Sequence, residues 1–436
     1  LYELARAGHD VGIELFVMDD GWFGNRDDDS SSLGDWYVNK KKLPNGLKGI
    51  CDKINALGMS FGIWVEPEML NVNSDLYRLH PDWAMDIPGC AHSEGRNQRI
   101  LDLCNPEVTE YIIDSMTKVF SSANIAYVKW DMNRIFSDYY SKYLKAQGRP
   151  QGETAHRYVM ALGRVMRTLT ERFPHILFEG CAAGGNRFDL GILCYFPQIW
   201  ASDNTDAVSR AYIQEGLSYG YPMSTVSAHV SVCPNHQTLR VTPLSTRFNV
   251  AAFGICGYEC NLVDMSRAER SEIKTQIDIY KKWRHAMQFG SFYRQRTGNI
   301  HQWTVVDEEA GRAVGLIMQE LVRANTQNEE YYAAGLDPEA VYSFYNRPLK
   351  HNVKEFGDLI NTVAPIHIRQ GSLLHGMVAK FVTMPGETEK YELSGSMLMN
   401  CGVRLKQAFA ATGFSEEVRH FPDFASRLYF MEKISD

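Results

Sequence analysis

The sequence predicts an α/β fold built on a parallel sheet or barrel, followed by a small antiparallel β-domain. Across residues 1–289, short apolar runs alternate with stretches whose apolar residues recur with the period of a helix. Strands that alternate with helices are typical of a parallel sheet or barrel. From residue 290 onward, short apolar runs are separated by Gly, Asn and charged turns. We therefore expect a barrel domain at residues 1–289 and a β-domain at 290–436.

Seven apolar runs are the predicted strands of the sheet, and four amphipathic stretches are the clearest predicted helices. The predicted strands cover residues 13–18, 59–65, 125–130, 176–178, 198–200, 223–226 and 250–255. The predicted helices cover residues 1–12, 47–57, 108–120 and 154–173. The longest of these helices is predicted to bury Val159, Leu162, Val165, Met166 and Leu169.

The C-terminal domain is predicted from shorter runs. The expected strands cover residues 290–300, 302–306, 313–318, 340–345, 366–369 and 403–409. Segments 371–382 and 395–401 are unusually rich in Met and Gly for β-structure, and the sequence assigns them no state.

Composition excludes several classes of function. The chain has 436 residues, 44% of them hydrophobic, and a net charge of −7, which favours a small neutral ligand and argues against nucleic-acid binding. No apolar stretch reaches the roughly 20 residues that a membrane span needs, so we expect no membrane association. The first residue is not Met and no signal peptide precedes the first helix, so we expect the chain to be a fragment.

The nine cysteines are scattered and form no CxxC pair. This pattern predicts free thiols in a reducing compartment, and hence a cytoplasmic protein. Because no Cys or His cluster recurs at ligand spacing, we expect no zinc site.

Two apolar runs each lead to an aspartate. AYVKWDMNR ends its run at Asp131, and FPQIWASDNTD reaches Asp203. The carboxyl ends of barrel strands carry the chemistry in (β/α)-barrels, and two carboxylates on different strands suit glycoside hydrolysis. A strand-terminal Asp is also a common helix cap or turn residue, so this alternative stays open for each of them.

Other candidates surround these two aspartates in the same kind of position. Asp19 and Asp20 follow the first apolar run; their side chains point to opposite sides of an extended strand unless Gly21 permits a bend. Lys129 and Asp131 project to the same side of their strand, which keeps the carboxylate ionised or forms a structural salt bridge.

Two further segments complete this set. In FGIWVEPEM, Trp64 lies at a strand end and Glu66 is a hydrogen-bond partner or a third candidate acid. The glycine pair in FEGCAAGGNRFD lets the backbone approach a ligand closely, although a glycine pair alone is a weak signal.

Taken together, these motifs resemble glycoside hydrolase family 36, the bacterial-type α-galactosidases. The motifs, in the family's order, are DDGWFG, GIWVEPEM, GRNQ, KWDMNR, FEGCAAGG and WASDNTDA. YELSGSMLMNCG and residues 424–431 also look like the family's C-terminal domain, so the resemblance covers most of the chain. It implies a catalytic (β/α)₈ TIM barrel whose first strand precedes this chain, so that the seven runs are strands two to eight.

The resemblance also implies an activity and its residues. It implies a retaining, exo-acting α-galactosidase that acts on oligosaccharides such as melibiose and raffinose, with Asp131 as nucleophile and Asp203 as acid/base. The positions that match the galactose pocket are Asp19, Asp20, Trp64, Arg96, Lys129, Asn133, Cys181 and Gly184. The family's chemistry needs no metal and no cofactor, and the parent protein is expected to be a homo-oligomer.

The proposed roles set physical requirements. Asp203 must hold a proton near neutral pH, and repulsion from Asp131 and Asp206 is expected to raise its pKa. Asp19 and Asp20 are expected to accept from the galactose O4 and O6 hydroxyls and so exclude glucose.

Alternative functions remain open at this point. An α-N-acetylgalactosaminidase or a galactosyl transferase of the raffinose-synthase kind would use the same scaffold and differ near the sugar O2, around residues 181–185. A carbohydrate-binding fragment without activity is the third alternative, because a barrel that lacks one strand exposes two unpaired edges.

Overall fold

The computed structural model describes residues 1–323, 329–362, 364–406 and 421–434. The chain divides into two compact units. The first contains Leu1–Asp203, Thr225–Ser227 and Asn261–Asp278. The second contains Asn204–Ser224, Ala228–Cys260 and Ile279–Asp436. The domain boundary expected at residue 290 stays a prediction.

A parallel sheet of seven strands, curled into a half-barrel, confirms the predicted α/β class. Its strands, in sheet order, are β1 (Leu15–Met18), β2 (Ser60–Val65), β5 (Ile125–Trp130), β6 (Leu177–Gly180), β7 (Gln198–Trp200), β8 (Val226–Ser231) and β9 (Ile255–Glu259). Neighbouring strands from β1 to β8 pair in parallel, so their carboxyl ends meet at one edge. β1 and β9 are the end strands of this order.

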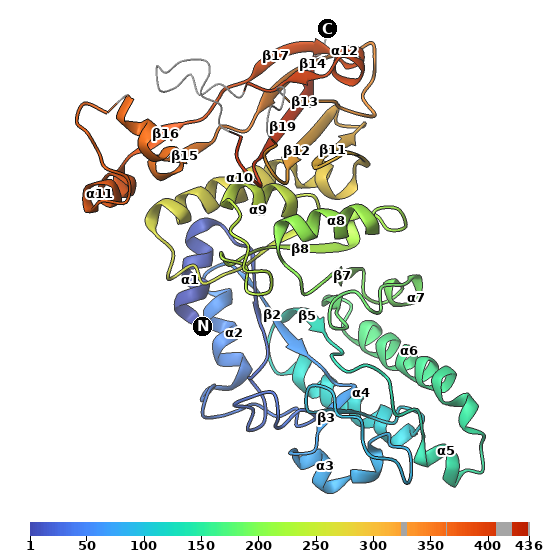
Figure 1. Cartoon of the computed structure of the whole chain (residues 1–436). Coiled ribbons are helices and arrows are strands. Elements are labelled where there is room, and N and C mark those ends of the chain that lie inside the picture. Colours follow the sequence, from blue (N-terminus) through green and yellow to red (C-terminus); the bar gives the residue numbers. More distant parts are fainter. Residues whose placement is uncertain (324–328, 363, 407–420, 435–436) are drawn as a thin grey trace. The chain divides into compact units, whose positions relative to one another are not determined.

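Helices connect these strands, and the four predicted at residues 1–12, 47–57, 108–120 and 154–173 are among them. They are α1 (Tyr2–Val11), α2 (Gly46–Asn55), α3 (Asp75–Leu79), α4 (Pro106–Ser121), α5 (Lys142–Ala146), α6 (Thr154–Arg172), α7 (Leu190–Leu193), α8 (Ala207–Leu217), α9 (Leu244–Ala251) and α10 (Arg267–Phe289). α1 contacts α2, and α4 contacts α6 (Figure 1). The antiparallel pair of short strands β3 (Met69–Asn71) and β4 (Gln98–Ile100), with α3 between them, lies between α2 and α4 in the chain.

Helix α4 illustrates how local sequence sets an element. The Asn105 side chain accepts a hydrogen bond from the Glu107 amide at 3.0 Å, and Pro106 occupies the first turn, where its missing N–H costs nothing. Ile112 and Met116, one turn apart, are fully buried. The cap and the apolar stripe therefore specify both the start of the helix and the face it buries.

The stripe predicted for α6 is correct except at one position. Tyr158, Leu162, Val165 and Leu169 are buried, whereas Val159 is 65% exposed. Residues 158, 162, 165 and 169 follow the three- and four-residue steps of one helix face, and residue 159 lies about 100° away from that face. The prediction for Val159 was wrong because residue 158 fills the stripe at this turn.

Two predicted strands are displaced in the structure. Residues Met223–Thr225 form a 3₁₀ turn and the strand begins at Val226; it includes the buried Ser227 and Ser231, which an apolar run does not reveal. Residues 244–251 form helix α9, and the last strand begins only at Ile255. The residues around Phe248 and Ala251 are buried. Their apolar side chains therefore do not recur with the period of a strand or of a helix, and the pattern cannot distinguish the two.

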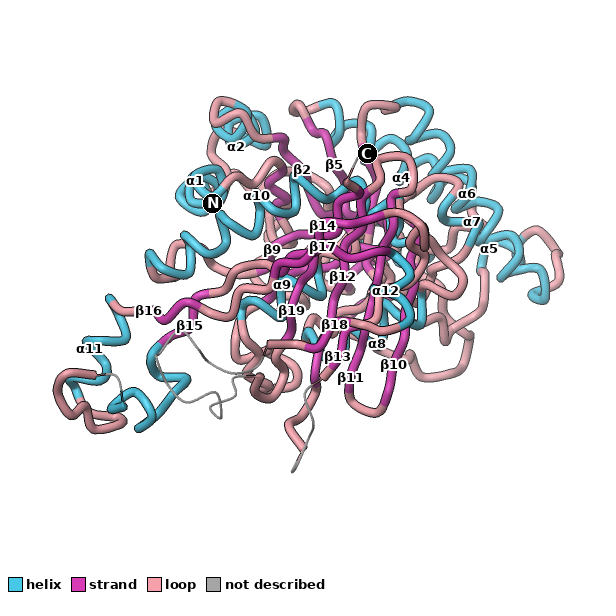
Figure 2. Tube along the Cα trace, turned by 90° about the horizontal axis from the view of Figure 1, so that it is seen from above, coloured by secondary structure: helices cyan, strands magenta, loops and turns pink. Residues whose placement is uncertain are grey.

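The second sheet is antiparallel, as predicted, and Figure 2 shows its strands running side by side. In sheet order it contains β10 (Ser291–Thr297), β11 (Ile300–Asp307), β12 (Arg312–Gln319), β19 (Ser426–Lys433), β14 (Val341–Asn346) and β17 (Lys390–Ser394). Two-stranded pairs join β13 (Glu330–Tyr331) to β18 (Val403–Arg404) and β15 (Lys350–Asn352) to β16 (Thr383–Pro385). One face of the large sheet shares its core with α8, α9 and the second half of α10.

Several C-terminal predictions need correction. Residues 366–369 form no strand: the Asn361 side chain bonds both the N–H and the C=O of Ile368, at 2.6 and 3.1 Å, in place of a strand partner. The strand predicted at 403–409 is confirmed only for Val403–Arg404, and residues 407–409 lie outside the described part. The two unassigned Met- and Gly-rich segments contain helices α11 (Leu373–Phe381) and α12 (Gly395–Asn400).

Two further observations concern the chain as a whole. Among the described helices, none combines the length and the apolar character needed to span a bilayer. The structure describes all nine cysteines, and none of them takes part in a disulfide bond.

Gly315 supports a test of how closely the antiparallel sheet is packed. A Cβ atom added there would lie 2.1 Å from the Tyr331 hydroxyl, which itself hydrogen-bonds Thr304 at 2.8 Å inside the core. We expect Gly315→Ala to lower the free energy of unfolding by about 1–3 kcal/mol through overpacking, measured by urea denaturation. Gly216→Ala in α8 is the control: nothing lies within 4 Å of its added Cβ, so stability should rise by up to about 1 kcal/mol. Equal stability of the two variants would contradict the prediction.

Candidate active site

Asp131 follows strand β5 and is surrounded by hydrogen-bond donors. Its backbone N–H donates to the Val65 carbonyl of β2 at 2.8 Å, which continues the sheet pairing by one residue. One carboxylate oxygen accepts from the Trp64 indole at 3.1 Å and from the Asn133 amide at 2.7 Å. The other oxygen accepts from the Met132 backbone N–H at 2.8 Å. The carboxylate is therefore held in one orientation.

The charge on this buried carboxylate is stabilised. Burial by itself opposes ionisation, but Lys129 and hydrogen bonds from Cys181, Trp64 and Asn133 outweigh it and lower the pKa of Asp131. Asp131 therefore carries its negative charge well into the acidic range. This agrees in direction with the expectation drawn from the spacing of Lys129 and Asp131.

Lys129 lies among several acceptors. Its ammonium is 3.4 Å from Asp19 and 5.5 Å from the centre of the Trp200 ring. Burial disfavours the charged amine, but Asp19, together with the thiol of Cys181 and the carboxylates of Glu179 and Asp131, raises the pKa of Lys129. The lysine is a permanent cation that connects the ends of β1, β5 and β7.

Asp203 lies just beyond strand β7 and is exposed. Its carboxylate accepts a hydrogen bond from the Trp200 indole at 2.9 Å. Because Lys129 lies against the same Trp200 ring, Asp203 and Asp131 have neighbours in common. Asp206, expected to act on Asp203, instead caps helix α8 through the Ser209 N–H and forms an ion pair with Arg240.

The loop after β6 contacts the backbone that leads to Asp203. Gly184 has a φ of +87°, and a Cβ atom there would lie 2.9 Å from the Ser202 Cα and 3.2 Å from the Asp203 nitrogen. A Cβ at Gly185 would lie 2.7 Å from the Ala201 carbonyl oxygen. These glycines therefore permit a close approach of two backbones, whereas the sequence analysis expected a close approach of the backbone to a ligand. Cys181 begins this loop, is buried, and hydrogen-bonds Asp131.

The two aspartates after β1 have different partners. Gly21, with a φ of +100°, permits the chain to bend directly after them. Asp19 pairs with Lys129, whereas both carboxylate oxygens of Asp20 accept from Arg26, at 2.7–3.1 Å. Arg26 is 3% exposed, and the sequence analysis missed it because no local pattern marks its partner.

Arg96 lies in the turn that leads into β4 and has a positive φ of 53°. Its side chain is exposed and makes no hydrogen bond to the described residues. Its charge acts on the buried Glu66 and slightly opposes the rise in the pKa of that group. The structure therefore brings Arg96 to the same strand ends, although no direct contact fixes it.

The buried Glu68 supports the strand ends, and the sequence analysis gave it no role. Glu68 accepts from the Trp130 indole, the Tyr158 hydroxyl and the Arg187 guanidinium, each at 2.8 Å. Its spacing from Glu66 in WVEPEM is the only local signal for this role.

The second network lies one strand further along the sheet. Glu179 on β6 accepts from the Tyr127 hydroxyl at 2.6 Å and from the Ser227 hydroxyl. Gln198 donates to both hydroxyls, at 3.0 and 2.7 Å. These side chains connect β5, β6, β7 and β8 beneath the candidate site.

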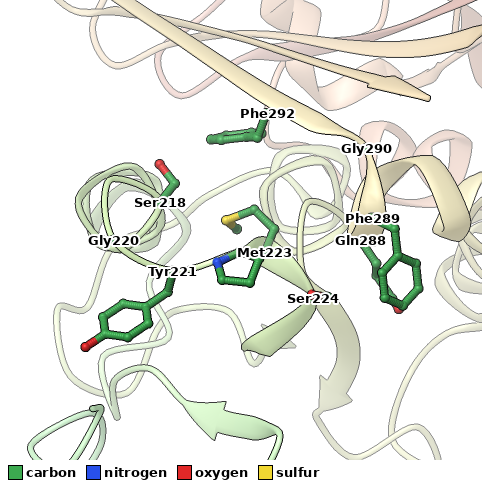
Figure 3. A pocket seen from close by; sticks show the side chains of 10 residues that line it. Ser218, Gly220, Tyr221, Met223, Ser224, Gln288, Phe289, Gly290 and Phe292 are labelled. Carbon is green, nitrogen blue, oxygen red and sulfur yellow. The ribbon is translucent and has the colours of Figure 1, made fainter. Parts of the chain in front are cut away.

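A cavity of about 420 Å³ lies elsewhere, in the second unit. Figure 3 shows Met223 pointing into it beneath Phe292, with Tyr221, Gln288 and Phe289 around it. The loop that lines it precedes β8, so the cavity is at the amino end of that strand. None of the ten candidate residues lines this cavity.

The comparisons with known proteins agree with this geometry. A family profile described as Melibiase matches residues 1–290, and one described as Glycosyl hydrolase family 36 C-terminal domain matches residues 300–431. The chain belongs to glycoside hydrolase family 36. The resemblance stated from the motifs is thereby confirmed.

Individual relatives of this family 36 chain are α-galactosidases. The chain is 49% identical over 345 residues to α-galactosidase AgaA of Geobacillus stearothermophilus, which covers 78% of this chain and 47% of that protein. It is 47% identical over 334 residues to α-galactosidase Mel36A of Lactobacillus acidophilus, covering 76% of this chain and 45% of the relative. The chain thus spans about half the length of the curated relatives it matches.

Solved structures agree over nearly the whole chain. The crystal structure of an AgaA variant in complex with raffinose has a TM-score of 0.83 at 40% identity, covering 99% of this chain and 53% of that one. The α-galactosidase from Lactobacillus brevis has a TM-score of 0.84 at 36% identity, covering 100% of this chain and 52% of its own. These neighbours support the barrel-type fold of this family 36 chain.

Proposed function

We propose that this chain is the catalytic part of a retaining, exo-acting α-galactosidase that removes terminal α-linked galactose from oligosaccharides such as melibiose and raffinose. The observation that carries the proposal is the ionised carboxylate of Asp131, oriented by hydrogen bonds beside Lys129 at the end of β5. Membership of family 36 supports the sugar and the linkage. The structure of a relative bound to raffinose supports the class of substrate.

In this proposal Asp131 is the nucleophile. A carboxylate that attacks an anomeric carbon must be ionised and must present a free lone pair in a fixed direction. The low pKa of Asp131 meets the first requirement, and the donors Trp64 and Asn133 meet the second. Attack forms a bond from the carboxylate oxygen to the anomeric carbon as the bond to the leaving oxygen breaks.

Asp203 is the proposed acid and base. Its exposed carboxyl group would protonate the leaving oxygen and then take a proton from the water that releases galactose. Retaining enzymes place the two carboxyl groups about 5–5.5 Å apart, and the shared neighbours Lys129 and Trp200 are compatible with a common site.

Sugar recognition is assigned to the polar groups around these two carboxylates. Asp19 and Asp20 are the proposed acceptors for the O4 and O6 hydroxyls, with Lys129 and Arg26 holding their charges in place. Arg96, Cys181 and Gly184 are proposed to contact the remaining hydroxyls. The assembly of the parent protein as a homo-oligomer and its cytoplasmic location remain predictions.

Substrate preference is the first test of the proposal. We expect the chain to release p-nitrophenol from the α-galactoside and not from the α-N-acetylgalactosaminide, because the loop at Gly184 and Gly185 is packed against backbone. Raffinose should be hydrolysed rather than made by galactosyl transfer to sucrose. Calorimetric binding of galactose without any hydrolysis would instead favour a carbohydrate-binding fragment.

Azide rescue tests the two carboxylate roles separately. In Asp131→Ala, turnover should stop, and added azide should attack from the face opposite the leaving group and give β-galactosyl azide. In Asp203→Ala, turnover should fall by about 10²–10⁴-fold, and azide should attack the β-linked galactosyl-enzyme and give α-galactosyl azide. Proton NMR of the anomeric signals distinguishes the products. The same anomer from both variants would refute the assignment.

The pH profile tests the role of Lys129. Because Asp131 acts ionised, activity is lost as pH falls through its lowered pKa. Lys129→Met removes the cation that lowers this pKa, so the acidic limb of kcat/KM should move upward by about 1–3 pH units. Lys129→Arg keeps the charge and should leave the limb in place. An unchanged limb in the Met variant would show that Lys129 does not hold the charge of Asp131.

A further inference from the structure

Glu66 is a buried carboxylate that, unlike Asp19, Asp20 and Glu68, forms no ion pair with the described residues. It follows strand β2, is 0% exposed, and precedes the equally buried Glu68 by two residues. Glu68 contacts the Arg187 guanidinium and two further donors. Among the described residues, Glu66 has no cation within ion-pair distance.

The two partners of Glu66 are neutral. One oxygen accepts a hydrogen bond from the Asn133 backbone N–H, and the other contacts the Gln98 side-chain amide at 3.0 Å. A buried carboxylate without a cation is costly to ionise, and the nearby charge of Asp131 increases that cost. In keeping with this, burial and then Asp131 raise the pKa of Glu66 to about 8.

Resting on the proposed function, we propose that Glu66 is a positioning residue that stays protonated at neutral pH and holds Asn133 against the nucleophile Asp131. Asn133 connects the two acidic groups: its backbone N–H donates to Glu66, and its side-chain amide donates to Asp131 at 2.7 Å. A neutral Glu66 keeps this connection without placing a second negative charge beside Asp131.

The position of the proton follows from the charges around the two groups. Lys129 acts on Asp131, whereas Arg96, whose charge acts on Glu66, forms no ion pair with it and does not offset burial and the charge of Asp131. A proton shared between two buried acidic groups therefore resides on Glu66, and Asp131 stays ionised for attack. Gln98 can accept a hydrogen bond from the protonated Glu66 if its amide is flipped. The flip places the amide oxygen where the amide nitrogen contacts Glu66.

Infrared spectroscopy tests the protonation directly and needs no enzymatic turnover. The wild-type chain should show a protonated-carboxyl C=O band at about pH 6 that disappears by about pH 10. Glu66→Gln should lose one carboxyl group's share of this band, and the proposed acid Asp203 supplies the remainder. Glu68→Gln is the matched control. Glu68 is as buried as Glu66 but pairs with the Arg187 guanidinium and is expected to be ionised, so its replacement should leave the band unchanged. A band of equal intensity in the wild-type chain and Glu66→Gln would overturn the proposal.

Hydrogen exchange and kinetics test the positioning role. Glu66→Gln keeps a neutral acceptor for the Asn133 N–H, so exchange at Asn133 should stay slow; Glu66→Leu removes the acceptor, and exchange should accelerate at least tenfold. The kcat on the p-nitrophenyl α-galactoside should fall at least tenfold in Glu66→Leu and recover in Glu66→Gln, with little change in KM. Equal exchange at Asn133 in the Leu and Gln variants would overturn the role.

If the wild-type chain has no α-galactosidase activity, the proposed function fails, and the infrared and exchange measurements still decide the proposal for Glu66.

Discussion

The negative charge of the buried Asp131 carboxylate needs a nearby cation and hydrogen-bond donors, and much of the local structure follows from that requirement. It lies at the end of a core strand, where water can solvate little of it, yet it stays ionised. Lys129 supplies a charge, Trp64, Asn133 and Cys181 supply donors, and each comes from a different strand or loop. The parallel register matters here, because it brings the carboxyl ends of β2, β5 and β6 to one edge.

The charged groups around Asp131 have charged partners of their own. Lys129 needs counter-charges, and Asp19 provides one at 3.4 Å. Asp20, beside it, is held by a nearly fully buried arginine, Arg26. Below the strand ends, Glu68 with Arg187 and Glu179 with Tyr127 tie neighbouring strands together. Removing one of these partners leaves a buried charge or donor unsatisfied, so the site and the stability of the half-barrel are coupled.

Sequence reasoning could predict the strands that lead to the site, and their residues explain why. Runs such as 125–130 are short, mostly apolar and preceded by an amphipathic helix, so both their type and their ends are readable. In residues 244–251 the buried positions include both polar and apolar residues, Thr246, Phe248, Asn249, Val250 and Ala251, so no hydrophobic period separates helix from strand there. The pairing of Glu68 with Arg187 joins positions 119 apart in the chain, and no local pattern contains it. The six motifs identified the family because they lie far apart in the chain and occur together in the family's order.

The glycine pair after β6 restricts how this site can change over evolution or in the laboratory. Gly184 and Gly185 lie so close to the backbone at Ala201 and Ser202 that an added methyl group at either position would collide with main-chain atoms, which cannot rotate away. Attempts to reshape this wall of the pocket for a bulkier sugar substituent therefore have no accessible single-step route through these two codons. Altered specificity would have to arise at neighbouring positions with room for a side chain, or through a remodelled loop of different length.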